Sequence, residues 1–203
     1  MTSLARRYDR IARWYDLLDA PFERKRYAAL RPLMFEGLRG ELLDAGIGTG
    51  RNCAYYPPDA VVSGIDTSAK MLALAARRCP TLAAGGRLHR MDVTAMRFDA
   101  GSFDAAVSSF LFCVLPEELQ TPALRELARV VKPGGTIRLL EYGYPAGFWR
   151  RLSLRLWQPW VSWAYGARFD RQTERHAAAA GLELVERRFV VDDLIKMLTL
   201  RVA

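Results

Sequence analysis

The sequence has few of the residues that metal sites and disulfide frameworks need. It contains two histidines and three cysteines among 203 residues. Cys53, Cys79 and Cys113 lie at spacings typical of neither a zinc site nor a disulfide pattern. We therefore predict no metal centre, and we interpret the three cysteines as small buried side chains that stay unpaired in a reducing compartment.

Long apolar runs, internal repeats and linkers are also absent. No apolar run reaches the roughly 18 residues that suggest a membrane-spanning helix, and we see no secretory signal. No low-complexity tract or Ser/Gly-rich linker divides the sequence. A chain of this length can bury one substantial core. We therefore expect one domain over residues 1–203, in the cytoplasm and peripheral on the inner face of the membrane.

The most informative pattern is a short apolar run that ends in an acid and leads into alternating glycines. Residues 42–50 read LLDAGIGTG, and Asp66 ends a second apolar run 20 positions after Gly46. Glycines let a ligand lie against bare backbone, and an acid at the next strand tip can hold both ribose hydroxyls. The spacing is neither that of a dinucleotide-binding loop nor that of a P-loop. The pattern therefore predicts a ligand with a ribose and no phosphates.

Hydrophobic periodicity alternates between strands and helices along the chain. Period-two runs predict strands near 41–45, 61–66, 86–91, 103–109, 135–141, 182–190 and 195–202. Helical patterns lie near 4–18, 22–38, 51–56, 68–78, 117–131 and 170–180. This alternation indicates a parallel sheet with helices on both faces, where ligands bind beyond the carboxyl ends of the strands.

Five motifs in this order resemble the class I S-adenosylmethionine-dependent methyltransferases over roughly residues 40–142. They are the acid-glycine loop, residues 64–68 with Met71-Leu72, the acidic strand end 91–93, the strand 102–107 and the turn 131–135. The resemblance implies a Rossmann-like α/β fold with a seven-stranded, mostly parallel sheet of order 3-2-1-4-5-7-6. It implies S-adenosyl-L-methionine as the cofactor and S-adenosyl-L-homocysteine as its product. The implied cofactor site comprises Tyr15, Asp44, Ala45, Gly46, Gly48, Gly50, Asn52, Asp66, Thr67, Met71, Asp92, Val93 and Ser108.

Two basic, aromatic segments lie outside these motifs. Residues 4–18 form an apolar helical stripe flanked by arginines, with Leu4, Tyr8, Ile11, Tyr15 and Leu18 on the stripe. Residues 148–163 contain four of the five tryptophans, interleaved with arginines. Tryptophan with arginine is typical of a lipid headgroup interface. The alternatives are a helix that covers the sheet edge for the first segment, and a buried aromatic cluster or a dimer interface for the second.

The formal net charge of +8 favours an anionic partner. Basic residues accompany tryptophan and leucine at helical spacing, which suits anionic lipid better than nucleic acid. We expect an anionic membrane surface and a phospholipid as partners, no nucleic acid, and a monomer. Within the domain we distinguish N-terminal amphipathic helices or a lid (1–38), the cofactor-binding core (40–142), an aromatic and basic interfacial insertion (145–180) and a C-terminal hairpin (182–203).

Further segments resemble the bacterial phospholipid N-methyltransferases, which convert phosphatidylethanolamine stepwise to phosphatidylcholine. These segments are 108–116, 139–142, 156–157, 159–160, 169–171 and 174–176, with Tyr8 and residues 14–16. The N-terminal tyrosine pattern is also similar to that of quinone-biosynthesis C-methyltransferases. The resemblance implies N-methylation of the phosphatidylethanolamine headgroup at the membrane surface. The alternatives are a soluble C- or O-methyltransferase that acts on a quinone-type small molecule, and a non-catalytic cofactor-binding protein.

An amine must lose its proton before its lone pair can attack a methyl carbon. Candidate proton acceptors near the carboxyl end of the sheet are Tyr15, Glu141, Tyr142 and His176. Tyrosine rings also suit an ammonium group by cation–π attraction. Candidate substrate contacts are Tyr8, Tyr144 and Tyr165 for the ammonium, and Arg168, Arg171 and Arg175 for a lipid phosphate. The competing interpretation is packing or membrane contact for each tyrosine, and a solvated helix for the arginines.

Overall fold

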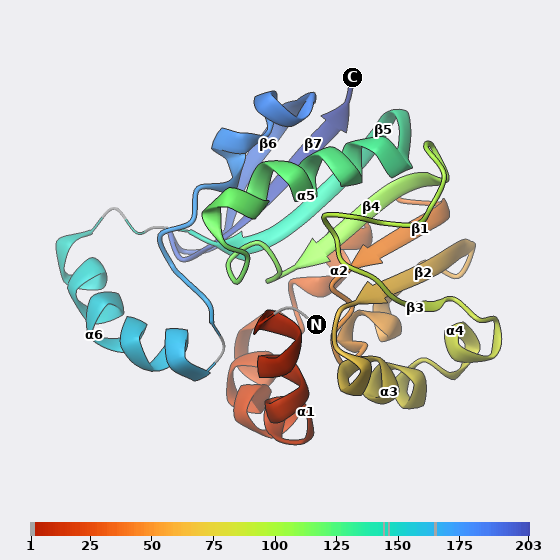
Figure 1. Ribbon diagram of the computed structural model, residues 1–203. Helices are drawn as coiled ribbons and strands as arrows, with labels where there is room; N and C mark the ends of the chain where they lie inside the picture. The colour runs from red at the N-terminus through yellow and green to blue at the C-terminus, as the bar shows by residue number, and fades with distance from the viewer. Residues whose placement is uncertain (1–2, 144, 146, 165) are drawn as a thin grey trace.

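A seven-stranded sheet forms the centre of the molecule (Figure 1). The computed structural model describes residues 3–143, 145, 147–164 and 166–203. The strands are β1 (Gly40–Ala45), β2 (Ala60–Asp66), β3 (Leu88–Arg90), β4 (Phe103–Ser109), β5 (Val131–Tyr142), β6 (Leu182–Val191) and β7 (Ile195–Val202). Their order is β3-β2-β1-β4-β5-β7-β6, with β7 antiparallel to β5 and β6 and the other pairs parallel. The predicted fold class and strand order are confirmed.

Both faces of the sheet are covered, as the run of apolar residues in β1 requires. Leu42 and Leu43 are adjacent and fully buried, yet they belong to different core clusters. Successive strand side chains point to opposite faces, so each residue anchors one layer. Leu43 packs in the cluster that includes Leu124 of α5 (Glu117–Val130), and Leu42 in the cluster that includes Met34 of α2 (Arg31–Phe35).

The helix that follows β2 shows how local sequence sets an element boundary. α3 (Ala69–Arg78) begins where the Ser68 hydroxyl accepts a hydrogen bond from the Met71 N–H at 3.1 Å. Such a cap satisfies one of the N–H groups left open by the first turn. Arginines in the last turn complement the helix dipole, and Pro80 opens the short helix α4 (Pro80–Ala84).

Several predicted helices differ in the structure. The segment near 22–38 divides into a π-helical turn, η1 (Glu23–Tyr27), and α2. Pro32 has no N–H to continue a helix from the residues before it, but it is well tolerated in the first turn of a new helix. The segments near 51–56 and 170–180 form 3-10 turns: η2 (Arg51–Tyr55), η3 (Thr173–His176) and η4 (Ala178–Ala180). Tyr56 has extended backbone because Pro57 follows it, and this ends η2 after little more than one turn. The structure adds α4 and a long helix, α6 (Phe148–Ala164), which composition alone marked only as interfacial.

The C-terminal end of α6 approaches α1 (Ser3–Phe22), while the rest of α6 stands out from the molecule (Figure 1). Arg7 of α1 donates a hydrogen bond to the Ser162 carbonyl of α6 at 3.0 Å. The predicted stripe on α1 is only partly an outer surface. Of its members, Tyr8 and Tyr15 are half-buried, whereas Leu18 is 43% exposed; Trp14, which lies off the stripe, is 51% exposed.

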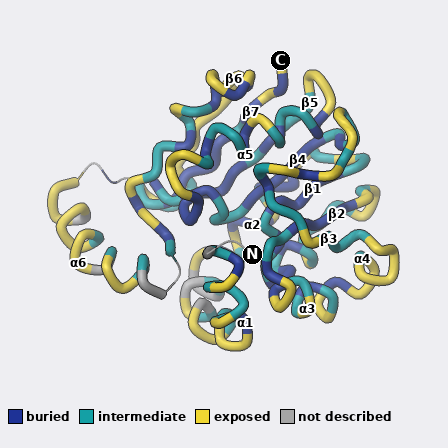
Figure 2. The backbone as a smooth tube through the Cα atoms, viewed as in Figure 1, coloured by how far each residue is buried: buried dark blue, intermediate teal, exposed yellow. Residues whose placement is uncertain are grey.

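Much of α6 faces outward (Figure 2). Phe148, Trp149 and Leu156 are each more than 70% exposed, at 71%, 78% and 75%. Isolated exposed apolar residues are ordinary, but several large ones on a single helix indicate a contact surface. Among the described residues, no helix is long and apolar enough to cross a membrane.

Candidate active site

The loop between β1 and η2 forms the floor of the site. Gly46 and Gly50 have φ values of 77° and 79°, in the region that favours glycine. A Cβ at Gly50 would lie 2.6 Å from Cys79 Sγ, and one at Gly46 would lie 3.2 Å from the Leu111 side chain. Both positions therefore need glycine for conformation and for space. Residues 46–49 line a cavity with this bare backbone.

The Asp66 carboxylate lies at the tip of β2, beside the loop. Its Oδ2 accepts a hydrogen bond from the Gly48 N–H at 3.1 Å, and its Oδ1 accepts one from the Ser68 N–H at 2.8 Å. Burial raises the pKa of Asp66 from 3.8 to about 6, although these hydrogen bonds oppose the shift. The carboxylate lines a cavity, so ribose hydroxyls would meet a charged acceptor there.

Asp44 is the penultimate residue of β1, beneath the loop, and lies outside the cavity linings. It is fully buried, and its Oδ2 accepts hydrogen bonds from Asn52 Nδ2 at 2.9 Å and the Tyr56 hydroxyl at 2.6 Å. Its Oδ1 has no hydrogen-bond partner among the described residues, and burial raises its pKa. Ser108 is also buried and donates to the Ala45 carbonyl at 2.9 Å. These predicted cofactor residues therefore support the loop from below.

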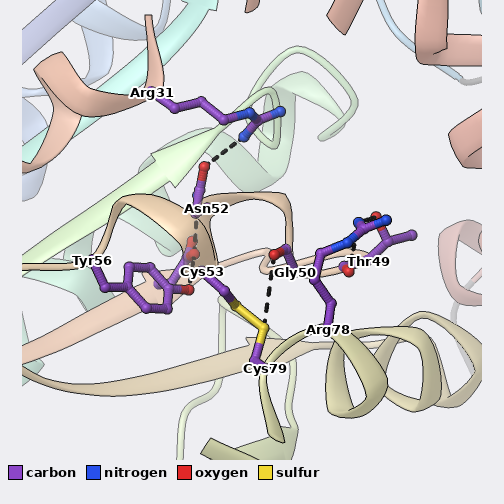
Figure 3. The surroundings of a disulfide bond; sticks show 9 residues. Arg31, Thr49, Gly50, Asn52, Cys53, Tyr56, Arg78 and Cys79 are labelled. Atoms are coloured by element: carbon purple, nitrogen blue, oxygen red, sulfur yellow. Dashed lines mark hydrogen bonds between the residues drawn. A yellow bond between two sulfur atoms is a disulfide. The ribbon is translucent and has the colours of Figure 1, made fainter. Parts of the chain in front are cut away.

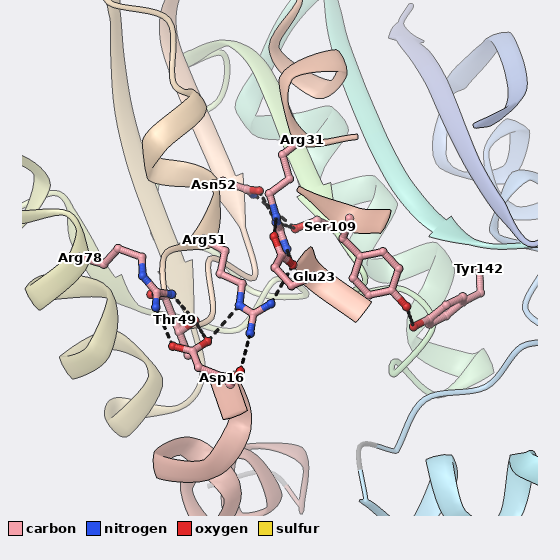
Figure 4. A network of polar contacts seen from close by, with 10 residues as sticks. Asp16, Glu23, Arg31, Thr49, Arg51, Asn52, Arg78, Ser109 and Tyr142 are labelled. Carbon is pink, nitrogen blue, oxygen red and sulfur yellow. Dashed lines mark hydrogen bonds and ion pairs between the residues drawn. The ribbon is translucent and has the colours of Figure 1, made fainter. Parts of the chain in front are cut away.

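Helix α1 closes the site from the opposite side (Figure 4). Asp16 accepts hydrogen bonds from Thr49 Oγ1 at 2.8 Å, Arg51 Nε at 2.9 Å and Arg78 Nη2 at 2.7 Å. Burial opposes ionisation of Asp16, but the hydrogen bonds hold its pKa below the usual value. Near the start of the helix, Asp9 contacts the cap of α3. Carboxylates on α1 thus clamp the helix over the glycine loop.

Two cavities lie between α1, the glycine loop and the strand ends. The smaller, of about 140 Å³, has a pair of acids, Asp66 and Asp92, on its wall. The larger, of about 420 Å³, reaches to α6. Tyr8 and Tyr15 line both cavities. The smaller cavity brings together the predicted cofactor residues Tyr15, Gly46, Gly48, Asp66, Thr67, Met71, Asp92 and Val93.

The larger cavity has an aromatic wall. The hydroxyls of Tyr27 and Tyr142 lie 2.9 Å apart. The Phe110 ring lies between these two residues, at centroid distances of 4.8 and 5.2 Å. Phe110 also has a φ of 57°, which non-glycine residues seldom adopt, and it lines both cavities. An unusual backbone conformation at a cavity junction is typical of functional positions.

The charged side chains that line the larger cavity are all arginines among the described residues. Arg31 is buried and donates to both Glu23 carboxylate oxygens, at 2.7 and 2.8 Å. Arg51 also contacts Glu23, at 2.7 Å (Figure 4). The third, Arg26, is exposed. The cavity therefore favours a neutral or negatively charged ligand over an ammonium group.

Two of the four catalytic candidates lie off both cavities. Glu141 is buried, and its carboxylate accepts hydrogen bonds from the N–H groups of residues 112–113 at 2.9 and 2.8 Å. Burial raises its pKa to about 7. The His176 ring nitrogens lie 2.9 Å from the Thr121 hydroxyl and 2.8 Å from Glu117 Oε1. The other two candidates, both tyrosines, line the larger cavity.

The predicted phosphate contacts also lie away from the cavities. Arg168 and Arg171 form ion pairs with carboxylates at 2.7 and 2.5 Å, and Arg175 is exposed. None of the three lines either cavity. Tyr144 and Tyr165 lie outside the described residues.

Sequence patterns did not identify Arg26, Tyr27, Arg31 or Phe110 as site residues. The first three lie within a segment whose pattern predicts a continuous helix, and they reach the site because η1 and α2 interrupt it. The available signal was the density of aromatic and charged residues in 22–31. Phe110 directly follows a recognised strand, so its place at the carboxyl end of β4 was the available clue.

A disulfide joins Cys53 of η2 to Cys79 at the end of α3 (Figure 3). The Cα atoms are 5.9 Å apart, and the residues are 26 positions apart in sequence. The prediction that these two cysteines stay unpaired is therefore wrong, because the fold brings together positions with no motif spacing. Cys113 is free and buried, as expected. Next to the disulfide, Arg78 donates to the Thr49 carbonyl at 2.9 Å, so the bridge braces the glycine loop.

Residues 42–135 match a family model described as a methyltransferase domain. A ubiquinone/menaquinone biosynthesis C-methyltransferase from Syntrophotalea carbinolica is 37% identical over 149 residues, which cover 68% of this chain and 60% of that protein. A phosphatidylethanolamine N-methyltransferase from Cereibacter sphaeroides is 32% identical over 105 residues, which cover 51% of each protein. The matches thus span between about half and three fifths of these two relatives.

Solved structures share the fold. Geranyl diphosphate C-methyltransferase from Streptomyces coelicolor A3(2), crystallised with S-adenosyl-L-homocysteine, superposes with a TM-score of 0.68 at 14% identity. The superposition covers 87% of this chain and 81% of that one. The glycine cradle, the acid at the tip of β2 and the strand order fit a cofactor with a ribose and no phosphates. Residues 42–135 therefore belong to the S-adenosylmethionine-dependent methyltransferase domain family.

Proposed function

We propose that this protein methylates a hydroxylated aromatic acceptor of the quinone-precursor type, at carbon or oxygen, with S-adenosylmethionine as the donor. The observation that carries this proposal is the larger cavity, which adjoins the glycine loop and combines an aromatic wall with a positively charged lining. A flat ring can stack against Phe110, and an ionised ring hydroxyl can accept hydrogen bonds from Tyr142 or the arginines. The C-methyltransferase relative supports this acceptor class.

The bound cofactor would supply a methyl group on a sulfonium sulfur for in-line attack. The residues of the chain contribute alignment, because holding two reactants in the correct orientation can remove much of the barrier to their reaction. Asp66 and the glycine loop would fix the ribose, while the wall around Phe110 orients the acceptor. Arg31 and Arg51 add positive potential, which favours an ionised phenol over its neutral form. Helix α1 covers the cavities and limits the access of water.

N-methylation of phosphatidylethanolamine is a second candidate. The tyrosine and phenylalanine rings of the cavity can attract an ammonium group through their faces, and the phosphatidylethanolamine N-methyltransferase relative favours this acceptor. The lining of the larger cavity is less suited to this reaction. The amine must lose its proton before it attacks, and the described residues place no carboxylate on the cavity wall to accept that proton. This candidate therefore ranks second.

Either acceptor class is compatible with work at a membrane surface, and we include such a surface in the proposal. Trp149 and Leu156 are exposed on α6, and Trp14 is exposed on α1. Exposed arginines accompany them, including Arg13 and Arg155. Apolar side chains with nearby cations suit the headgroup region of an anionic membrane. Because Leu154 and Trp160 of α6 also line the larger cavity, an acceptor with an apolar tail could enter beside this helix.

The test is methyl transfer from labelled S-adenosylmethionine to a panel of acceptors in detergent and in vesicles. We expect label in an alkylated hydroxybenzene with a free ring position and little label in phosphatidylethanolamine. Label in phosphatidylethanolamine alone would replace the first candidate with the second. If the protein binds S-adenosyl-L-homocysteine but transfers a methyl group to no acceptor, it is a non-catalytic cofactor-binding protein, and the proposed activity is refuted.

A further inference from the structure

The π-helical turn η1 aims its side chains at the larger cavity. The turn is closed by a hydrogen bond from the Ala28 N–H to the Glu23 carbonyl at 3.0 Å. Wide turns of this kind are rare and are frequent at functional sites. Arg26 and Tyr27 both line the larger cavity, and Glu23 contacts two arginines that do so. The turn is therefore part of the acceptor site.

Two of these three side chains already have partners inside the protein. Glu23 binds Arg31 and Arg51, and its pKa stays below the usual value because the hydrogen bonds outweigh burial. Tyr27 pairs with the Tyr142 hydroxyl. Arg26 is exposed, and the described residues give it neither an ion pair nor a side-chain hydrogen bond. Its guanidinium is thus available to a ligand at the mouth of the cavity.

The surrounding charges do not neutralise this cation. The network behind Arg26 contains two carboxylates, Asp16 and Glu23, and three guanidinium groups, those of Arg31, Arg51 and Arg78. The buried Asp44 carboxylate also acts on Arg31 and is joined to it through Asn52, so the charges of the network balance before Arg26 is counted and the charge of Arg26 stays uncompensated. A planar guanidinium of this kind binds a carboxylate or a phosphate through paired hydrogen bonds.

We propose that Arg26 is an oxyanion subsite, which pairs with a carboxylate or phosphodiester group on the acceptor while another part of the acceptor lies beside the glycine loop. This inference rests on the proposed function for its acceptor. It narrows the acceptor to an aromatic acid or a phospholipid, because a neutral quinol has no oxyanion for this position. It also assigns anion recognition to the π-helical turn, in place of the three arginines predicted for that role, Arg168, Arg171 and Arg175.

The test measures binding to protein saturated with S-adenosyl-L-homocysteine, by titration calorimetry. The probes are a 3-alkyl-4-hydroxybenzoate, short-chain phosphatidylethanolamine below its micellar concentration, and a neutral alkyl hydroquinone. Arg26→Gln should weaken binding of the oxyanion probe by about tenfold, the low end for a charged hydrogen bond because the side chain is exposed. It should leave the hydroquinone within about twofold. The probe that loses affinity identifies the source of the oxyanion as a carboxylate or a lipid phosphodiester.

Arg77→Gln is the matched control, because Arg77 is an exposed arginine of α3 that lines neither cavity. It should leave the affinities for all three probes unchanged. The subsite is refuted if both variants weaken the probes equally, if Arg26→Gln weakens the neutral probe as much as the charged ones, or if neither charged probe binds the wild type. Because no turnover is measured, a failure of methyl transfer would refute the proposed function alone, and an intact transfer activity would not rescue the subsite.

Discussion

Replacement of Asp66 by asparagine should separate stability from cofactor binding. The carboxylate accepts two backbone N–H groups, yet burial still raises its pKa from 3.8 to about 6. A carboxyl group whose pKa is higher in the folded state destabilises that state when it is ionised. The destabilisation is absent below pH 3.8, grows between pH 3.8 and pH 6, and is complete above about pH 6.

The size of this effect follows from the shift. A difference of about two pKa units corresponds to about 3 kcal/mol of unfolding free energy. This cost is net of the hydrogen bonds from Gly48 and Ser68, which already lower the pKa. Asparagine is neutral and, like the protonated acid, has one carbonyl oxygen, so Asp66→Asn should be more stable than the wild type by up to about 3 kcal/mol at about pH 7.5. At about pH 4, where the wild-type carboxyl is largely protonated, the two stabilities should be close.

Binding should change in the opposite direction. Two ribose hydroxyls would donate to the ionised carboxylate, and a charged acceptor strengthens each such bond. Affinity for S-adenosyl-L-homocysteine should fall about 10- to 100-fold in Asp66→Asn at about pH 7.5. Wild-type affinity should weaken as the pH falls below about 6, and the variant should lack this dependence. Urea unfolding and titration calorimetry across roughly pH 4.5–8 measure both effects, and unchanged affinity in the variant would refute the assignment of Asp66 to the ribose.

Three further predictions concern the clamp, the disulfide and α6. Asp16→Asn should weaken homocysteine-product binding several-fold and speed hydrogen exchange in α1, because Arg51 and Arg78 lose a charged acceptor; unchanged exchange would show that Asp16 does not hold the helix. Replacement of Cys53 and Cys79 together by alanine should lower the free energy of unfolding by about 2–4 kcal/mol, as should a dithiol reductant, and equal denaturation midpoints would contradict a stabilising bridge. Trp149→Ala with Leu156→Ala should reduce sedimentation with anionic vesicles while sparing cofactor affinity, whereas exposed Leu184→Ala with Val185→Ala on β6 should not; equal losses in both pairs would remove α6 as the contact surface.

The features that sequence alone predicted are those that depend on local chemistry. The glycine loop and Asp66 at a strand tip follow from short motifs, and the strand order follows from the family resemblance that these motifs carry. The acceptor cavity does not. Its wall combines Tyr27 with Tyr142, which are 115 positions apart, and no periodicity records such a contact. The Cys53–Cys79 bridge was missed for the same reason.

Helix α1 shows why an amphipathic pattern can be correct and still mislead about its partner. The stripe containing Tyr8 and Tyr15 predicts one face that avoids water, and both residues are half-buried. The structure places that face on the two cavities, and it leaves Trp14 and Leu17 exposed on another side. An apolar stripe records only that a surface is covered. The polar residues of the helix show which surface covers the stripe, because Asp16 contacts the glycine loop directly.

The polar contacts of α1 and η1 join the two halves of the site into one network. Arg51 follows the glycine loop, and it contacts Asp16 of α1 and Glu23 of η1 at 2.9 and 2.7 Å. Glu23 in turn holds Arg31 on the wall of the acceptor cavity. A cofactor that moves the loop would therefore shift groups that face the acceptor, and an acceptor that engages η1 would act back on the loop. Because linkage is reciprocal, any gain in cofactor affinity caused by the acceptor must equal the gain in acceptor affinity caused by the cofactor, and Arg51 is the residue through which that coupling would pass.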